Sequence, residues 1–181
     1  MSISLSTFVF SSPQDDYKLS AKSFLYQEIA KYGNAQYAEL PVLLSVIRTT
    51  AMLHQQNHWV SKEKTFYGDH LLFMRLYEET DKVVDVIAEK TVGFTTEELV
   101  CLSPQISHIS ALISLLNNST GQKTPVESSY QITLFLNALT TEVFNSLESS
   151  KLLTPGLEQT IGTLLETIEA HSYLLKQRFA K

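Results

Sequence analysis

The sequence of 181 residues contains a single cysteine, Cys101, so the chain cannot form an internal disulfide. No histidine can be assigned to Cys101 as a partner, and we expect it to be a core residue instead of a nucleophile. The sequence has no run of about 18 apolar residues and no basic segment before its short apolar N-terminal stretch. These absences predict a soluble, cytoplasmic protein in a reducing compartment.

Residues that interrupt helices are also scarce, because the chain has only six glycines and five prolines. The hydrophobic fraction of 44% and the charged fraction of 18% are ordinary for a globular protein. Helix-forming residues dominate between the prolines, which separate segments more than they interrupt them. The prolines stand at Pro13, Pro41, Pro104, Pro125 and Pro155.

Basic charge is missing from the N-terminus, where residues 1–17 contain no lysine or arginine. We interpret residues 1–38 as a tail followed by a possible short helix from about Tyr17 to Tyr32. Residues 39–181 are long enough for one domain with an adequate core.

Four amphipathic patterns predict four long helices within residues 39–181. The first begins near Pro41, and its apolar stripe continues into His54 and His58. The second runs from about Thr65 to Thr91 and stops at Gly93. The third and fourth are marked by apolar positions at Ile132, Leu136, Leu139, Val143 and Leu147, and at Leu157, Ile161, Leu164, Ile168 and Leu175.

The connection between the second and third helices is about 30 residues long. Within it, Thr95 and Glu98 have the spacing of a capping box. Ser103 starts a short apolar helix that ends near Asn117, and Thr154 starts the fourth long helix. Four helices with one long crossover predict an all-α, ferritin-like four-helix bundle.

Possible metal ligands follow one stripe of the second long helix. At 100° per residue, His70 and Glu89 share a face but lie roughly 28 Å apart, whereas metal–ligand bonds are only about 2.0–2.6 Å. If two copies of the helix pack antiparallel about a two-fold axis, His70 lies near Glu89 of the other copy. The stripe consists of His70, Met74, Glu78, Asp81, Asp85 and Glu89.

The same region resembles the ferroxidase-site signature of the Dps mini-ferritins, the DNA-binding proteins from starved cells. His58 precedes His70 by twelve residues, and Asp85 precedes Glu89 by four, as in that family's pattern. The resemblance is densest over residues 40–93 and weaker over the last helix. It is carried by His58-Trp59, Phe66-Tyr67-Gly68-Asp69-His70, Asp85, Glu89 and the ending Ile168-Glu169-Ala170-His171-Ser172-Tyr173-Leu174-Leu175.

The resemblance implies a dodecameric shell that oxidises Fe(II) with peroxide or dioxygen and stores the ferric mineral, which limits oxidative stress. It implies that His58 and His70 of one subunit and Asp85 and Glu89 of its partner are the metal ligands and catalytic residues. Other divalent metals are expected to bind the same site.

Two features depart from the family pattern. The position one turn after His70 usually carries a carboxylate, and here it is Met74, whose soft thioether suits iron poorly. Glu78, one further turn along, is a candidate substitute. The turn formed by residues 61–65 contains no glycine, unlike the corresponding turn of the family.

Several residues keep two interpretations at this stage. Asp81 is either a metal ligand or an interface residue, and His54 is either a ligand or a core histidine. His108 and His171 are interpreted as packing or surface residues, and Trp59 as packing against the site. No HExxH or Glu-x-x-His motif occurs, which favours a site between subunits over a di-iron centre inside one bundle.

Two rival functions remain beside ferroxidase activity. One is a structural shell or nucleoid-associated protein with an attenuated iron site, and the other is a helical interaction protein without metal. DNA binding is doubtful, because the first basic residue is Lys18 and the net charge is -5. The only clustered basic residues are Lys176, Arg178 and Lys181.

Overall fold

A computed structural model describes residues 13–62, 65–117 and 123–178, and all regular elements in these ranges are helical. The N-terminal tail that the sequence predicts at residues 1–12 lies outside the described residues. The elements are α1 (Pro13–Ile29), η1 (Ala30–Tyr32), α2 (Glu39–Val60), α3 (Phe66–Phe94), η3 (Glu97–Val100), α4 (Leu102–Asn117), α5 (Pro125–Ser149) and α6 (Pro155–Gln177).

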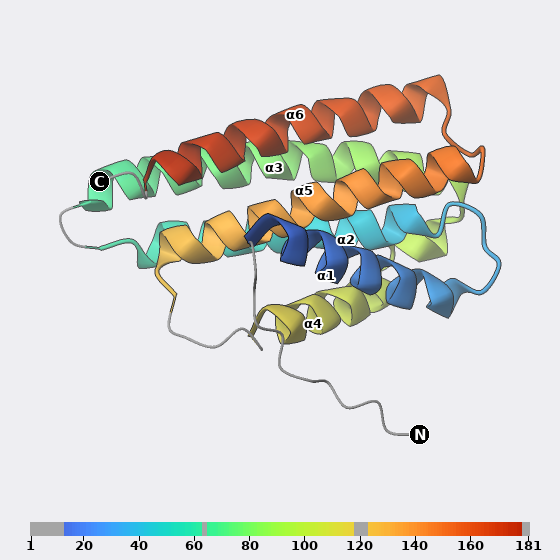
Figure 1. Ribbon diagram of the computed structural model, residues 1–181, viewed down its shortest axis with the longest axis horizontal. Coiled ribbons are helices and arrows are strands. Elements are labelled where there is room, and N and C mark those ends of the chain that lie inside the picture. The colour runs from blue at the N-terminus through green and yellow to red at the C-terminus, as the bar shows by residue number, and fades with distance from the viewer. Residues whose placement is uncertain (1–12, 63–64, 118–122, 179–181) are drawn as a thin grey trace.

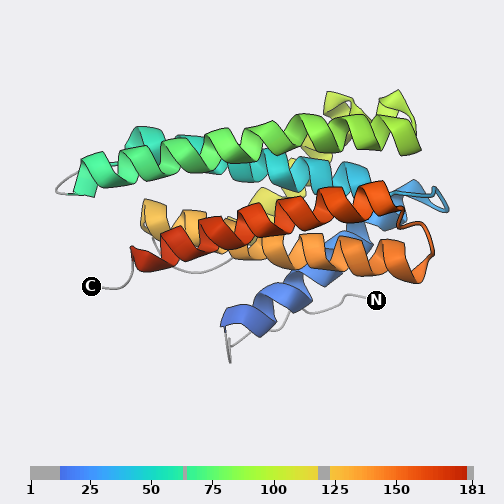
Figure 2. The ribbon, with the colours of Figure 1, turned by 90° about the horizontal axis from the view of Figure 1, so that it is seen from above.

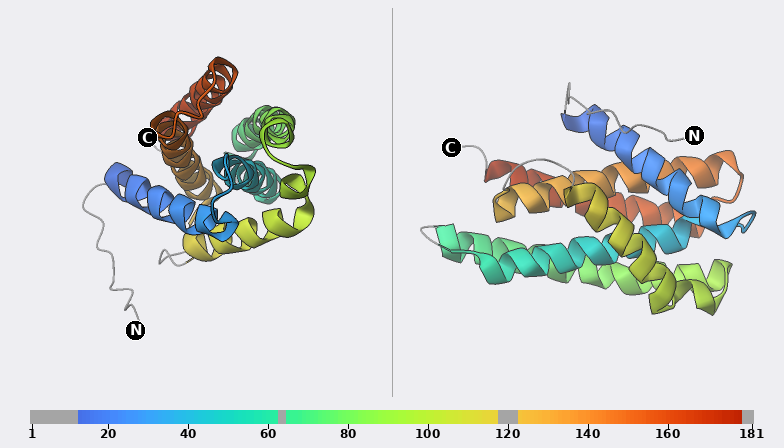
Figure 3. Two further views of the ribbon diagram at one scale, coloured as in Figure 1. Left: turned by 90° about the vertical axis from the view of Figure 1, so that its right-hand side faces the viewer. Right: turned by 90° about the horizontal axis from the view of Figure 1, so that it is seen from below.

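The four long helices α2, α3, α5 and α6 form the bundle, with α2 against α3 and α5, and α6 against α3 and α5 (Figures 1 and 2). Neighbouring helices run antiparallel, and η3 with α4 leads the chain back along the bundle before α5 begins. Helices α1 and α4 lie on the outside of the bundle in the end view of Figure 3. The predicted all-α bundle with a long crossover containing a short helix is confirmed.

Side chains at the N-termini of α5 and α6 account for where these helices begin. The Thr124 hydroxyl accepts from the backbone N–H of Glu127, and the Glu127 carboxylate accepts from the backbone N–H of Thr124 at 2.7 Å. This reciprocal pair is a capping box. The Thr154 hydroxyl accepts from the backbone N–H of Leu157, which confirms the predicted start of the fourth long helix.

The end of α3 differs from its prediction. The Thr95 hydroxyl donates to the carbonyl of Thr91 at 2.5 Å, so Thr95 closes α3 and does not form the predicted capping box with Glu98. The helix α3 does not stop at Gly93 as predicted but continues to Phe94, so Gly93 lies inside its last turn. The backbone at Gly93 is not left-handed, and Gly93 therefore does not act as a glycine helix terminator.

One hydrophobic core joins the bundle to α1 and α4. Leu25 of α1 and Leu112 of α4 are fully buried in the same cluster as Leu43 of α2 and Leu139 of α5. A smaller cluster of Phe73, Leu76 and Leu175 holds α3 against α6. Because burial of large apolar side chains is the main stabilising contribution to folding, α1 and α4 are structural parts of the bundle domain.

An ion pair joins the end of α6 to the start of α3. Arg178, at the end of α6, donates through Nε to the Asp69 carboxylate near the start of α3 at 2.8 Å. Asp69 is nearly buried and immediately precedes His70. The C-terminus of α6 therefore holds the segment of α3 that carries one of the predicted ligands.

Among the described residues, no helix is long and apolar enough to cross a membrane.

Candidate metal centre

The bundle brings His58 and His70 into direct contact. His58 lies in the last turn of α2 and His70 near the start of α3, and the antiparallel pairing of these helices places the two side chains at one end of the bundle. Their rings are stacked, with 3.7 Å between centroids and 25° between planes. Both side chains are half-buried. The twelve-residue spacing noted in the sequence thus corresponds to a contact across the α2–α3 turn.

Reciprocal hydrogen bonds fix the orientation of the two rings. Nδ1 of His58 lies 2.8 Å from the carbonyl oxygen of His70, and Nδ1 of His70 lies 3.1 Å from the carbonyl oxygen of His58. A carbonyl oxygen can only accept, so each Nδ1 carries the proton and donates it. In the neutral rings Nε2 then holds the lone pair, which is the tautomer that a metal-binding histidine needs.

Aromatic rings surround this histidine pair on two sides. Phe66 lies 5.0 Å from the ring of His70, and Tyr77 lies 5.5 Å from the ring of His58 in an edge-on arrangement. Trp59 was expected to pack against the site but is 69% exposed in the single chain. The single chain leaves the indole on the surface, so packing of Trp59 against a site between two subunits stays a prediction.

The carboxylates of the α3 stripe remain on the surface of the single chain. Asp85 and Glu89 are exposed, as are Glu78 and Asp81, whereas Met74 is half-buried. In the part of the chain that the structure describes, no three His, Cys, Asp or Glu side chains lie close enough together to hold a metal ion. One chain therefore brings two imidazoles together and leaves its acidic stripe facing outward.

His54 is a core histidine whose hydrogen bonds are all satisfied. In the neutral ring Nδ1 of His54 accepts from the Ser129 hydroxyl at 3.0 Å, and Asn57 donates to the same hydroxyl. The Thr133 hydroxyl donates to the Ser129 carbonyl, so it accepts from Nε2–H of His54 at 3.5 Å. Burial, and to a lesser extent the nearby His171, lower the pKa of His54 to about 3. With no lone pair left over, His54 is not placed to bind metal.

His171 forms a second buried polar contact that the sequence stripe did not reveal. Its Nε2 lies 2.8 Å from the Glu79 carboxylate, and Glu79 also accepts from Arg75 at 2.9 Å. Burial lowers the pKa of His171, although Glu79 acts in the opposite direction. The sequence contains an indication that His171 is buried, since His171 continues the apolar stripe of Leu164, Ile168 and Leu175. No neighbouring residue in the sequence indicates that Glu79 is its hydrogen-bond partner.

His108 ties the crossover helix α4 to α1 and α2. The Ser45 hydroxyl donates to the Pro41 carbonyl and so accepts from Nδ1–H of His108 at 3.0 Å. The Tyr32 hydroxyl lies 3.1 Å from Nε2 of His108, and the buried Glu28 carboxylate lies 3.6 Å from the same atom. Burial is the largest cause of the lowered pKa of His108. His108 is therefore a packing histidine, one of the two interpretations that the sequence allowed.

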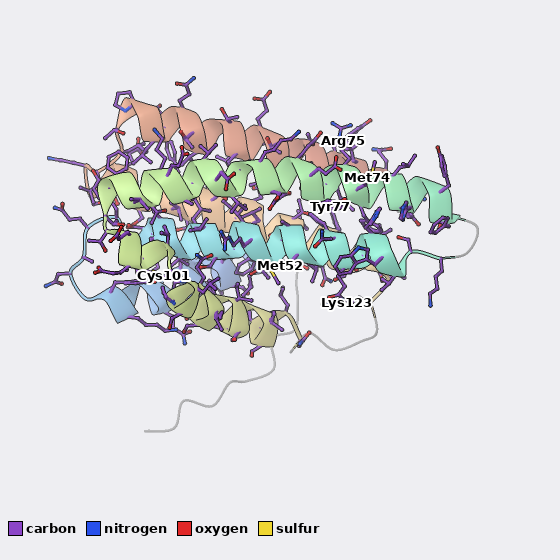
Figure 4. The ribbon with its side chains drawn as sticks, turned by 180° about the vertical axis from the view of Figure 1, so that it is seen from behind. Met52, Met74, Arg75, Tyr77, Cys101 and Lys123 are labelled. Carbon is purple, nitrogen blue, oxygen red and sulfur yellow. The ribbon has the colours of Figure 1, made fainter. Side chains whose placement is uncertain are left out.

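Cys101 is exposed, so the prediction that it is a core residue is wrong. It lies between η3 and α4, at the end of the molecule where α3 finishes (Figure 4). The sulfur contacts the Glu97 carbonyl at 3.6 Å. The segment between η3 and α4 places Cys101 at the surface. The apolar character of a residue does not by itself indicate whether it faces the core.

Comparisons with known proteins give one informative result. No protein-family model matches the chain, and no curated protein sequence does. A solved structure, that of Dps from Thermosynechococcus elongatus, superposes with a TM-score of 0.64 at 16% sequence identity, over 90% of this chain and 96% of that one. The chain thus has the ferritin-like fold of a Dps, which confirms the fold class predicted from the helix pattern and the resemblance.

Proposed function

We propose that this protein binds and oxidises Fe(II) in a Dps-like manner, at a site shared by two subunits across a two-fold axis. The observation that carries the proposal is the histidine pair at the α2–α3 turn. His58 and His70 present two Nε2 lone pairs side by side, and backbone carbonyls hold both rings in the required tautomer.

The proposed site takes its carboxylates from a second copy of the chain. Asp85 and Glu89 lie four residues apart on α3, exposed and roughly four to five turns from His70. Two α3 helices packed antiparallel would place each histidine pair opposite the other copy's carboxylates. Exposed Met52 and Trp59 on the adjacent helix α2 supply apolar surface for such a contact. Asp81 and Glu78 would then both lie near the axis.

The chemistry is the oxidation of two Fe(II) ions by one peroxide, which takes up two protons and yields two Fe(III) ions and two waters. Iron is the substrate here. Imidazole nitrogen and carboxylate oxygen both suit iron, and the anionic carboxylates favour the more highly charged ferric product. From the family resemblance we infer that the dimers build a dodecameric shell in which ferric mineral is stored.

The test is Fe(II) oxidation by the purified protein, followed as ferric absorbance with peroxide and with dioxygen, together with sizing of the assembly. The variant His70→Ala should lower metal affinity at least about tenfold while helical content is unchanged. Tyr173→Ala is the matched control, because Tyr173 is an exposed ring on α6, which carries no proposed ligand. Loss of folding in His70→Ala, or undiminished metal binding, would contradict the proposed role of His70.

A second candidate function follows from Met74. A thioether in place of a carboxylate weakens iron binding, and the protein would then be a structural shell with an attenuated iron site. Oxidation no faster than in the His70→Ala variant, in an assembly of full size, would favour this alternative.

A further inference from the structure

We propose that an exposed apolar stripe of α4 packs against the same helix of a second copy of this chain. The α4 stripe consists of Leu102, Ile106, Ile109 and Ile113. The contact shares the two-fold axis of the proposed function, but it requires neither a metal nor the carboxylates of α3. The α4 contact and the iron site can therefore fail separately.

The surface of α4 divides into three faces at 100° per residue. Gln105, His108 and Leu112 are buried against the bundle. About 90° from them, the α4 stripe covers about 60° of arc, with successive spacings of four, three and four residues. The next face carries a row of exposed serines, namely Ser103, Ser107, Ser110 and Ser114. The helix thus has a polar face suited to water beside an apolar face that is not.

The α4 stripe is largely exposed in the single chain. Leu102 is 66% exposed, Ile106 57% and Ile113 42%. Ile109 is half-buried, yet it packs against neither hydrophobic cluster of the described residues. Scattered apolar side chains are normal on a protein surface, but a contiguous exposed row of them marks an interaction site.

The pattern of the α4 stripe fits another helix of the same kind. Apolar residues at alternating spacings of four and three residues form the contact stripe of paired helices. Helix α4 contains no lysine, arginine, aspartate or glutamate from Leu102 to Asn117. It therefore carries no formal charge that would attract an oppositely charged partner or repel an identical helix. Depletion of charged residues is also typical of the buried core of an interface.

Exposed apolar side chains extend from α4 across the neighbouring helices. Helix α2 packs against α4, and it exposes Met52 and Trp59, two turns apart, with Met52 labelled in Figure 4. On α3, the exposed Val92 follows Asp85 by two turns and so shares the face of the acidic stripe. A two-fold axis that runs across these helices at right angles to α3 places each helix opposite its own copy. This continuity favours a second copy over an unlike protein.

The experiment compares the assembly of the purified full-length protein with that of its variants by sedimentation velocity. The unmodified protein should sediment as a dimer or a multiple of dimers. Ile106→Glu and Ile113→Glu should each weaken the association of two copies at least about tenfold, because pairing would bury carboxylates without partners. Ser110→Glu is the matched control, because it places the same charge on the serine face and should leave assembly unchanged. Circular dichroism checks that each variant keeps its helices.

A photo-cross-linker in the α4 stripe identifies what covers it. A benzophenone amino acid in place of Ile106, in a mixture of nitrogen-isotope-labelled and unlabelled chains, should give cross-links that join α4 segments of two different copies. Three results would each overturn the contact. These are a monomeric unmodified protein, equal assembly of Ile106→Glu and Ser110→Glu, and cross-links that do not reach α4 of another copy.

A second pair of variants separates this proposal from the proposed iron chemistry. Asp85→Asn and Glu89→Gln should lose Fe(II) oxidation yet keep the assembly of the unmodified protein. An unmodified protein that does not oxidise Fe(II), but whose assembly depends on Ile106, would refute only the iron proposal. An assembly that oxidises Fe(II) and is insensitive to Ile106→Glu and Ile113→Glu would refute only the α4 contact.

Discussion

The buried histidine His54 makes the stability of the folded protein depend on pH. It follows the apolar stripe of α2 and packs beside the ring of His171, with 6.3 Å between centroids. Its hydrogen bonds to Ser129 and Thr133 require the neutral ring. Folding therefore excludes a proton that the unfolded chain accepts readily.

The first prediction concerns stability and pH. The pKa of His54 is about 3 in the folded protein and near 6.5 in an unfolded chain, so its contribution to stability is complete above about pH 6.5 and is lost as pH falls toward 3. Urea unfolding should show a free energy of unfolding that decreases between pH 7 and pH 5, with at most about 1.4 kcal/mol per pH unit from this proton.

The variant His54→Gln is the control for that pH dependence. It should be less stable at pH 7 but should have a flatter stability profile between pH 7 and pH 5. The pKa values of His108 and His171 are lowered in the same direction, so part of the slope should remain. Parallel profiles for the two proteins would show that His54 does not exclude the proton.

The second prediction addresses the departure at Met74. The variant Met74→Asp restores a hard anionic ligand one turn after His70, so it should raise Fe(II) occupancy and the initial rate of Fe(II) oxidation. It should also lower stability in the absence of metal, because a half-buried carboxylate without a partner is unfavourable. An unchanged oxidation rate would mean that Glu78 already supplies this ligand, or that oxidation occurs elsewhere.

At the scale of elements, the Arg178–Asp69 ion pair is a long-range contact between α6 and α3 next to the candidate site. Arg178 and Asp69 are 109 residues apart, and the guanidinium also lies against Gly68, where an added Cβ would come within 3.6 Å. The pair holds the first turn of α3, directly before His70.

The third prediction tests this ion pair. Arg178→Gln should lower the free energy of unfolding by about 1–2 kcal/mol, because Asp69 keeps its charge in a nearly buried place, while Arg178 is partly exposed and so partly screened. Arg75→Gln is the control, since Arg75 is 55% exposed and pairs with Glu79 on the same helix. It should change stability by less than about 0.5 kcal/mol. Equal effects of the two variants in urea unfolding would contradict the role given to Arg178.

Local periodicity predicted the long helices well, because each has its own apolar stripe, and α5 and α6 also have side-chain caps within four residues. The family resemblance grouped His58 with His70, and their contact is nearly local because only a short turn separates the antiparallel helices. The partners of Asp69 and His171 are 109 and 92 residues away, and one sequence carries no periodic signal for such pairs. The exposure of Cys101 was missed for a related reason: it depends on how the crossover is oriented.

At the scale of the whole molecule, the charge distribution bears on DNA binding. The chain carries a net charge of -5, and a shell of many subunits multiplies that charge. Of the C-terminal basic cluster, Arg178 is already paired with Asp69, and Lys181 lies outside the described residues.

The fourth prediction is that plasmid DNA shows no gel shift at neutral pH and physiological ionic strength, where the screening length is about 8 Å. Phosphate neutralisation by lysine and arginine is the main source of DNA affinity, and this chain offers little of it. A tight complex that is abolished by deleting the last six residues would show that the C-terminus supplies the missing basic surface.

The central claim, a metal site shared by two copies of the chain, is tested most directly by mixing two inactive variants. His70→Ala retains the carboxylates, and Glu89→Gln retains the histidine pair, so a mixed dimer would contain one intact site. With free exchange of equal amounts, half of the dimers are mixed and each has one of two sites, which predicts about a quarter of the unmodified Fe(II) oxidation rate. Each variant alone should be inactive. Mixed assemblies verified by mass spectrometry that remain inactive would contradict a site built from two subunits.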